Sequence, residues 1–128
     1  MAETFLYLTL GTNDLARAAR FYDATLAPLG LIRRATEETE LGYGLPADSR
    51  TRLWITLPFD GMAATVGNGS MPALVAPSQD AVRAFHKAAL AHGGTDEGAP
   101  GLRPYGRAFF AAYVRDPDGN KLSAVCEG

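Results

Sequence analysis

The chain has 128 residues, of which 47% are hydrophobic and 20% charged, and its formal net charge is −2. This length and composition suit one compact domain with its own core. The near-neutral charge excludes the basic field that nucleic-acid binding requires, and no apolar run reaches the roughly 18 residues that would span a bilayer.

The cysteine content and the first residues bear on the compartment. Cys126 is the only cysteine, so no disulfide can form within the chain. Residues 1–10, MAETFLYLTL, lack the basic start and long apolar stretch of a secretory signal. We therefore expect a cytoplasmic protein that binds neither nucleic acid nor membrane.

The first half of the chain predicts a strand, a helix and three more strands. Residues 5–10 are a β-favouring run, and residues 12–30 have the apolar spacing of a helix that Asn13 or Asp14 can cap. Residues 58–69, PFDGMAATVGNG, predict a loop. The three shorter extended runs between helix and loop are residues 31–38, 41–45 and 52–57.

The same order of elements returns in the second half. Residues 71–76 are extended, and Ser78 can cap a helix over residues 79–94. A shift of 64 positions aligns Phe21 with Phe85, one of several matches between the halves. Three extended segments then close the chain, at residues 99–102, 108–114 and 121–126.

This duplication predicts a single domain over residues 1–128, built from two βαβββ modules of about residues 1–66 and 67–128. The fold class is α+β. Each open sheet can bury one face under its helix, so we expect a cup-shaped, partly open mixed β-sheet with the helices on its outer face.

Strand alternation predicts which side chains line the cup. The helix side should take Leu6, Leu8, Leu10, Leu53, Ile55, Leu57 and Leu74. The cup side should take Tyr7, Thr9, Arg52, Trp54, Thr56, Met71, Lys121 and Ser123. Tyr105 stands in the loop before the penultimate strand, where it could reach over the opening.

Residues 116–119, Asp-Pro-Asp-Gly, form a strong turn signal before the last strand. The proline presets φ for a turn, and Gly119 accepts a positive φ without steric cost. Asp116 and Asp118 are expected to act as turn residues and not as an acid–base pair.

Three segments together resemble the vicinal oxygen chelate superfamily of glyoxalases, bleomycin resistance proteins and dioxygenases. The segments are LTLGTNDLARAARFYDATLAPLG, AVRAFHKAALAHGGTDEGAPGLRP and AAYVRDPDGNKLSAVC. The resemblance covers nearly the whole chain, and it implies the paired βαβββ fold that the duplication also indicates.

The resemblance also implies where a metal would bind. Enzymes of this superfamily hold a divalent ion in the cup with His or Glu side chains, and three of those positions fall on Tyr7, Met71 and Ser123. The fourth lies near residues 54–57, which also lack His, Asp and Glu. A phenol, a thioether and a neutral hydroxyl are poor donors for such an ion, so we expect a degenerate site with no metal and no other cofactor.

Other potentially reactive side chains give no catalytic arrangement. His86 and His92 lie six residues apart on the predicted helix, so they point in different directions and cannot pair as ligands. Cys126 should lie on the core face of its strand as a buried, unreactive thiol. The sequence therefore identifies no catalytic residue.

The favoured hypothesis is a small-molecule-binding protein that acts without a metal, as a homodimer. The superfamily includes metal-free members that bind antibiotics in the cup, and an apolar pocket with a few directional hydroxyls is typical of a small-molecule site. Two alternatives stay open: a metal-dependent lyase, isomerase or dioxygenase with altered ligands, and a non-catalytic partner-binding module. The candidate ligand-binding residues are Tyr7, Thr9, Arg52, Trp54, Thr56, Met71, Tyr105 and Ser123.

Overall fold

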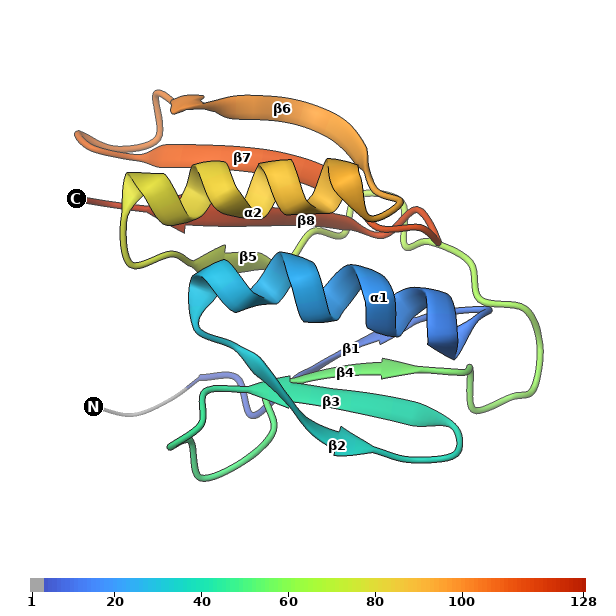
Figure 1. The fold of residues 1–128 in the computed structure, drawn as a ribbon. Helices are drawn as coiled ribbons and strands as arrows, with labels where there is room; N and C mark the ends of the chain where they lie inside the picture. The colour runs from blue at the N-terminus through green and yellow to red at the C-terminus, as the bar shows by residue number, and fades with distance from the viewer. Residues whose placement is uncertain (1–3) are drawn as a thin grey trace.

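The computed structural model describes residues 4–128 and consists of two βαβββ modules (Figure 1). The first module contains β1 (Leu8–Gly11), α1 (Leu15–Leu26), the short 3-10 helix η1 (Ala27–Leu29), β2 (Ile32–Thr36), β3 (Glu40–Gly44) and β4 (Leu53–Thr56). The second contains β5 (Ala73–Val75), α2 (Gln79–Ala91), β6 (Thr95–Leu102), β7 (Phe110–Arg115) and β8 (Lys121–Cys126).

Each module forms its own four-stranded mixed sheet. The strand orders are β1-β4-β3-β2 and β5-β8-β7-β6, which are the same order once the numbering is shifted by one module. In each sheet the first and last strands of the module pair in parallel, and the other neighbours are antiparallel. The two helices pack side by side, and the two sheets do not close into a barrel (Figure 1). The predicted fold class and module repeat are confirmed.

The helices begin and end where the local chemistry requires. Asp14 caps α1 by accepting a hydrogen bond from the backbone N–H of Arg17 at 3.0 Å, and Ser78 caps α2 in the same way through Ala81. After η1, Gly30 adopts a φ of 82°, a left-handed conformation that glycine reaches without steric cost. No helix within residues 4–128 is long and apolar enough to cross a membrane.

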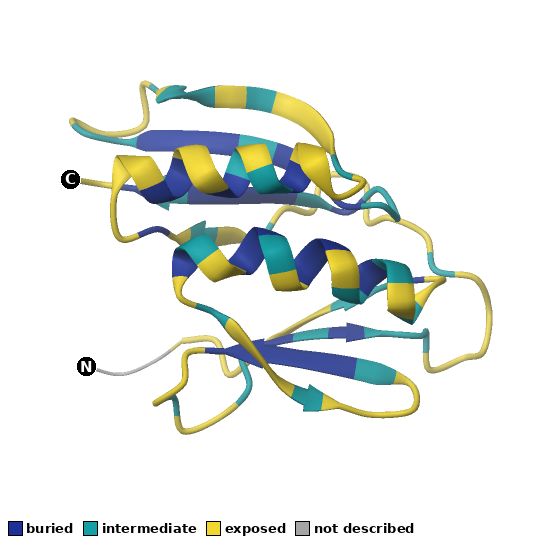
Figure 2. Ribbon diagram, in the orientation of Figure 1, coloured by how far each residue is buried: buried dark blue, intermediate teal, exposed yellow. Residues whose placement is uncertain are grey.

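One hydrophobic core serves both modules. The core consists of the inner faces of both helices and the helix-facing side chains of the central strands. Figure 2 shows that β3, β7 and β8 are largely buried, whereas β2 and β6 are largely exposed. Phe21 of α1 and Phe85 of α2, the aromatic pair that the repeat aligned, are both fully buried. Cys126 lies in this core as predicted.

The expected helix-side set is wrong at its ends. Leu53 and Ile55 are buried as predicted, but Leu6 is 54% exposed and precedes β1, which begins only at Leu8. Leu57 follows the end of β4 and is partly exposed. Leu8 lies within β1 and is also 36% exposed, so alternation predicts the face of a side chain but not how far that side chain is covered.

The Asp-Pro-Asp-Gly turn does more than reverse the chain. Asp116 is buried, and its carboxylate accepts hydrogen bonds from the backbone N–H groups of Asp118 and Asn120 and from the Asn120 side chain. Its fourth donor is the hydroxyl of Tyr22 on α1, at 2.5 Å. A carboxylate buried in one module is thus satisfied partly by the other module.

Asp118 extends this link to the start of α1. Its carboxylate accepts hydrogen bonds from the Thr12 hydroxyl and the Asn13 backbone N–H, and it pairs with the Arg17 guanidinium at 2.6 Å. The Asn120 side chain also donates to the backbone carbonyl of Gly11 at 2.9 Å. The expectation that both aspartates serve only their own turn was incomplete, because contacts between residues about 100 positions apart leave no local signal.

We expect Tyr22→Phe to lower the free energy of unfolding by about 1.5–3 kcal/mol, because it removes a hydrogen bond to a buried charged acceptor. Burial, followed by the charge of Asp116, raises the pKa of Tyr22 well above its ordinary value. Folding therefore favours the protonated phenol, and this contribution is complete below about pH 10 and lost as the pH rises further. The variant should show a shallower loss of stability above pH 10 in urea-unfolding experiments.

Tyr43→Phe is the matched control. The Tyr43 hydroxyl donates to Asp23, which is partly exposed and also pairs with Arg33 at 2.6 Å, so its loss should cost only about 0.5–1 kcal/mol. Equal destabilisation by the two variants would contradict a special role for the Tyr22–Asp116 bond.

Candidate functional site

The inner face of the first sheet, on the side away from α1, is organised in rows across its strands. In one row Thr9 of β1 lies beside Trp54 of β4, which faces Gly42 of β3. In the next row Thr56 of β4 faces Glu40 of β3. Paired residues in neighbouring strands share a face, so these five positions lie together on one surface.

The Trp54 indole approaches the backbone of β3 closely at Gly42, which has no side chain. A Cβ atom at Gly42 would come within 2.9 and 3.1 Å of two indole carbons of Trp54, and within 2.7 Å of the Thr51 methyl. The contacts below 3.0 Å are closer than real Cβ contacts, so a side chain at this position would require the indole or Thr51 to move. The indole is half-buried, so part of its surface remains open to the space above the sheet.

Two adjoining cavities lie over this surface. The first has a volume of about 510 Å³ and is lined by Tyr7, Thr9, Glu40, Arg50, Thr51 and Trp54. The second has a volume of about 860 Å³ and is lined by Tyr7, Thr9, Thr12, Asn13, Thr39, Glu40, Thr56, Leu57, Pro58, Phe59, Gly61, Met62 and Ala63. Because they share Tyr7, Thr9 and Glu40, we treat them as one inner groove, defined by these two sets of residues.

The inner groove brings together half of the predicted ligand-binding residues. Tyr7, Thr9, Trp54 and Thr56 all line it, as strand alternation suggested. Arg52 lies elsewhere: its guanidinium binds the Asp48 carboxylate at 2.9 Å and the backbone carbonyl of Leu6 at 3.0 Å. Those hydrogen bonds to Arg52 hold the pKa of Asp48 below its usual range.

Arg52 belongs instead to an apolar cavity of about 400 Å³ between the N-terminal segment and β5. Tyr7 lines both this apolar cavity and the inner groove. Most of the lining is aliphatic or aromatic, and several of these side chains are exposed. The exposed apolar residues here are Phe5, Leu6, Leu8, Leu45 and Val75.

Met71, Tyr105 and Ser123 line neither the inner groove nor this apolar cavity. Ser123 is fully buried in β8 between Ala73 of β5 and Tyr113 of β7, and its hydroxyl has no hydrogen-bond partner in the described structure. Tyr105 is 70% exposed and packs edge-on against Phe109 at 5.5 Å between ring centroids. Met71 is at the surface, two residues before β5.

The residues at the superfamily's metal positions do not suit a divalent ion. Tyr7, Met71 and Ser123 offer a phenol, a thioether and a hydroxyl, none of them the carboxylate, imidazole or thiolate that such an ion prefers. Ser123 is also the only one of the three that is buried. Within residues 4–128, no group of three His, Cys, Asp or Glu side chains could hold a metal.

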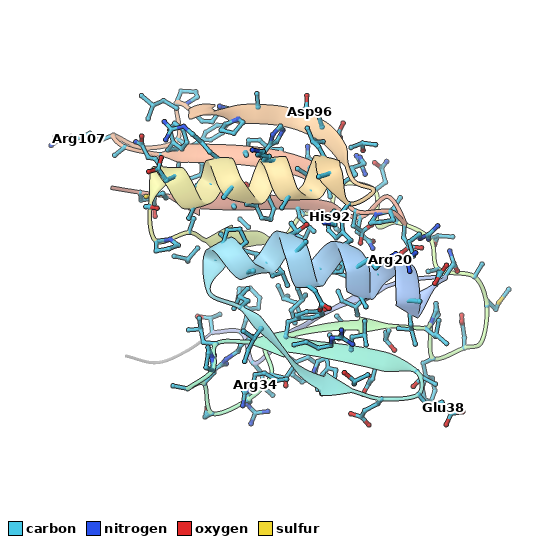
Figure 3. All side chains as sticks on the ribbon, viewed as in Figure 1. Arg20, Arg34, Glu38, His92, Asp96 and Arg107 are labelled. Carbon is cyan, nitrogen blue, oxygen red and sulfur yellow. The ribbon has the colours of Figure 1, made fainter. Side chains whose placement is uncertain are left out.

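The two histidines belong to the helix side of the second module. The Nε2 atom of His86 lies 2.8 Å from the Asp96 carboxylate of β6, and this hydrogen bond lowers the pKa of Asp96. His92, at the end of α2, bonds the carbonyl of Ala88 (Figure 3). Neither residue lines the inner groove.

Sequence reasoning missed Glu40 and Gly42. Both lie on the inner face of β3, which begins at Glu40, whereas the sequence predicts an extended segment from residue 41. Extending that strand by one residue and applying the alternation that located Trp54 would have found Glu40. The contact between Gly42 and Trp54 depends on the pairing of β3 with β4, which the sequence did not establish.

Comparisons with known proteins identify similar chains. The family model described as Glyoxalase/Bleomycin resistance protein/Dioxygenase superfamily matches residues 4–123. A glyoxalase/bleomycin resistance protein from Albidiferax ferrireducens is 40% identical, with a TM-score of 0.87, over 97% of this chain and 98% of its own. No curated protein matches the sequence.

Two further solved structures share the fold at lower identity. A glyoxalase-related enzyme from Fulvimarina pelagi has a TM-score of 0.73 at 22% identity, over 94% of this chain and 86% of its own. A glyoxalase I mutant from Zea mays has a TM-score of 0.69 at 21% identity, over 95% of this chain and 46% of its own. At these identities the likeness extends to the fold alone.

We expect Gly42→Ala to displace the Trp54 indole, because the new methyl group would occupy the space under the ring. Trp54 is the only tryptophan in the chain, so the protein's tryptophan fluorescence reports this ring alone. The emission maximum should shift to longer wavelength as the ring becomes more exposed to water.

Gly44→Ala is the control on the same strand. There a new Cβ atom would meet mainly the flexible end of Arg34, which can move, at 3.1 Å. Its emission spectrum should match that of the parent protein. An unchanged spectrum for Gly42→Ala would contradict the described position of the indole.

Proposed function

We propose a function on one premise: the chain belongs to the Glyoxalase/Bleomycin resistance protein/Dioxygenase superfamily. Our proposal is that the inner groove binds a small planar or aromatic molecule without a divalent metal. The position of Trp54 over Gly42, with an open ring surface, is the observation that carries it.

The groove has the composition of a small-molecule site. Trp54 and Tyr7 offer aromatic surface to a planar ring, and stacking of this kind adds to the free energy gained by burying apolar area. Thr9 lies in the same row as the indole and Thr56 lies in the next row. The Thr9 hydroxyl can donate to or accept from a polar substituent, whereas the Thr56 hydroxyl, which lies 2.9 Å from the carbonyl of Leu57, is placed to accept.

The donor chemistry supports binding without a metal. The thioether of Met71 suits Cu(I) better than Mg, Mn, Fe or Zn, and Ser123 is enclosed within its sheet. In the groove itself, Glu40 is the only side chain with a carboxylate, and a single carboxylate does not form a stable site for such an ion.

We also propose that the protein acts as a homodimer in the cytoplasm. The exposed side chains around the apolar cavity beside β5, among them Phe5, Leu45 and Val75, support a second copy packing there, because such contiguous patches commonly mark interfaces.

We expect light scattering after size exclusion to give twice the mass of one chain, and Val75→Asp to shift the protein toward the monomer. A parent protein that remains monomeric at high concentration would contradict the dimer.

We expect neutral two-ring compounds such as 2-naphthylmethanol to shift the indole N–H signal of Trp54 in ¹H–¹⁵N spectra, which show only one tryptophan. Trp54→Leu should weaken their binding at least about tenfold, equivalent to about 1.4 kcal/mol, because the stacking surface is lost. Calorimetry gives the affinity of the variant, which has no indole signal.

Tyr105→Leu is the control for this measurement, since Tyr105 is aromatic and exposed but lies outside the groove. It should bind the compound as the parent protein does. Absence of any shift across a broad panel of planar compounds would contradict the proposed function.

We expect the protein to retain far less than a stoichiometric amount of divalent metal. Protein expressed in medium supplemented with Zn, Ni, Mn and Fe, then dialysed without chelator, should contain only traces by elemental analysis. The donor set at Tyr7, Met71 and Ser123 is the reason. One bound metal per chain would instead favour a metal-dependent lyase, isomerase or dioxygenase with altered ligands.

A further inference from the structure

The larger cavity of the inner groove carries a single charge. Among the described residues that line it, Glu40 is the only carboxylate and there is no Lys, Arg or His, and the other polar side chains are hydroxyls and an amide. Glu40 also lines the first cavity beside Trp54. One carboxylate therefore faces both parts of the groove.

Within the described residues, no cationic side chain neutralises Glu40. Among residues 4–128, the arginines of the first module pair with carboxylates other than Glu40: Arg17 with Asp118, Arg33 with Asp23 and Arg52 with Asp48. The Glu40 side chain is partly buried, so water and salt screen its charge less than they would at an open surface. A bound cation would meet an acceptor that has no internal partner.

Lys121 lines an adjoining cavity of about 250 Å³ that shares Thr9 with the groove, and Arg50 is the competing charge in the groove itself. It lines only the first cavity, and its side chain is exposed. Its backbone carbonyl is held by the Arg34 guanidinium at 2.7 Å, on the β2 side of the sheet (Figure 3). Solvent screening reduces the field of an exposed guanidinium more than that of a partly buried carboxylate.

We propose that the inner groove selects a planar aromatic ring that carries a protonated amine, with the amine bound by Glu40 while the ring stacks on Trp54. This inference rests on the proposed function and names its ligand class. The charge-assisted hydrogen bond to the carboxylate gives the selectivity.

The strand geometry sets the length of the ligand. Thr56, the partner of Glu40, is two residues beyond Trp54, which corresponds to roughly 7 Å along the strand. The glutamate side chain covers part of that distance. The amine therefore belongs one or two carbons from the ring.

Three compounds that share one ring test the proposal: 2-naphthylmethylamine, 2-naphthylmethanol and 2-naphthoate. Titration is followed by the single indole N–H signal of Trp54 at pH 7, where the amine is protonated. The amine should bind about tenfold more tightly than the alcohol, and the carboxylate should bind more weakly than both. Raising the salt concentration should narrow this preference.

Glu40→Gln removes the charge and keeps the shape of the side chain. It should reduce the preference for the amine over the alcohol to less than about twofold, because the charge-assisted hydrogen bond is lost. Glu38→Gln is the control: Glu38 lies in the turn between β2 and β3, is exposed, and does not line the groove (Figure 3). Glu38→Gln should keep the full preference of the parent protein for the amine over the alcohol.

Equal affinity of the parent protein for amine and alcohol, or a preference that survives Glu40→Gln, overturns this inference and leaves the proposed function intact. If none of the three compounds moves the indole signal, the proposed function fails, and the assignment of the ligand class fails with it.

Discussion

The buried carboxylate of Asp116 is the constraint on which the relative position of the two modules depends. It must be satisfied inside the protein, and one of its four donors, the Tyr22 hydroxyl, belongs to the helix of the other module. Asp118 binds the start of the same helix through Thr12 and Arg17. The turn that follows β7 thus holds α1 through Tyr22, which is itself a member of the buried core. Because α1 follows β1 directly, the same contact also fixes the edge of the sheet that carries the inner groove.

The inner groove depends on the absence of a side chain at Gly42. Gly42 lets the Trp54 indole lie against β3, so the ring forms a floor and does not fill the space above the sheet. Tyr7, the threonines and Glu40 then surround that floor with a few directional polar groups. In this chain the positions where the superfamily holds a metal carry a phenol, a thioether and an enclosed hydroxyl. The proposed binding therefore relies on stacking and on one carboxylate, and not on coordination.

Much of the fold could be predicted from the sequence because its signals are local. The cap at Ser78 and the alternation in β4 each act within a few residues, and the sequence predicts both. For α1 it narrows the cap to Asn13 or Asp14, and the structure shows Asp14. The contacts of Asp116 with Tyr22 and of Gly42 with Trp54 join segments that are distant in sequence or paired only through the sheet. No local sequence pattern predicts these two contacts. For the same reason alternation placed Tyr7, Thr9, Trp54 and Thr56 on one surface, but it could not show that Met71, Tyr105 and Ser123 line a different part of the molecule.

A crystal structure of the protein with 2-naphthylmethylamine tests the central claim most directly. The account predicts the ring stacked on the Trp54 indole above Gly42, with the ammonium group within hydrogen-bonding distance of the Glu40 carboxylate. An indole covered by the protein's own side chains, or a divalent metal held between Tyr7, Met71 and Ser123, would contradict it.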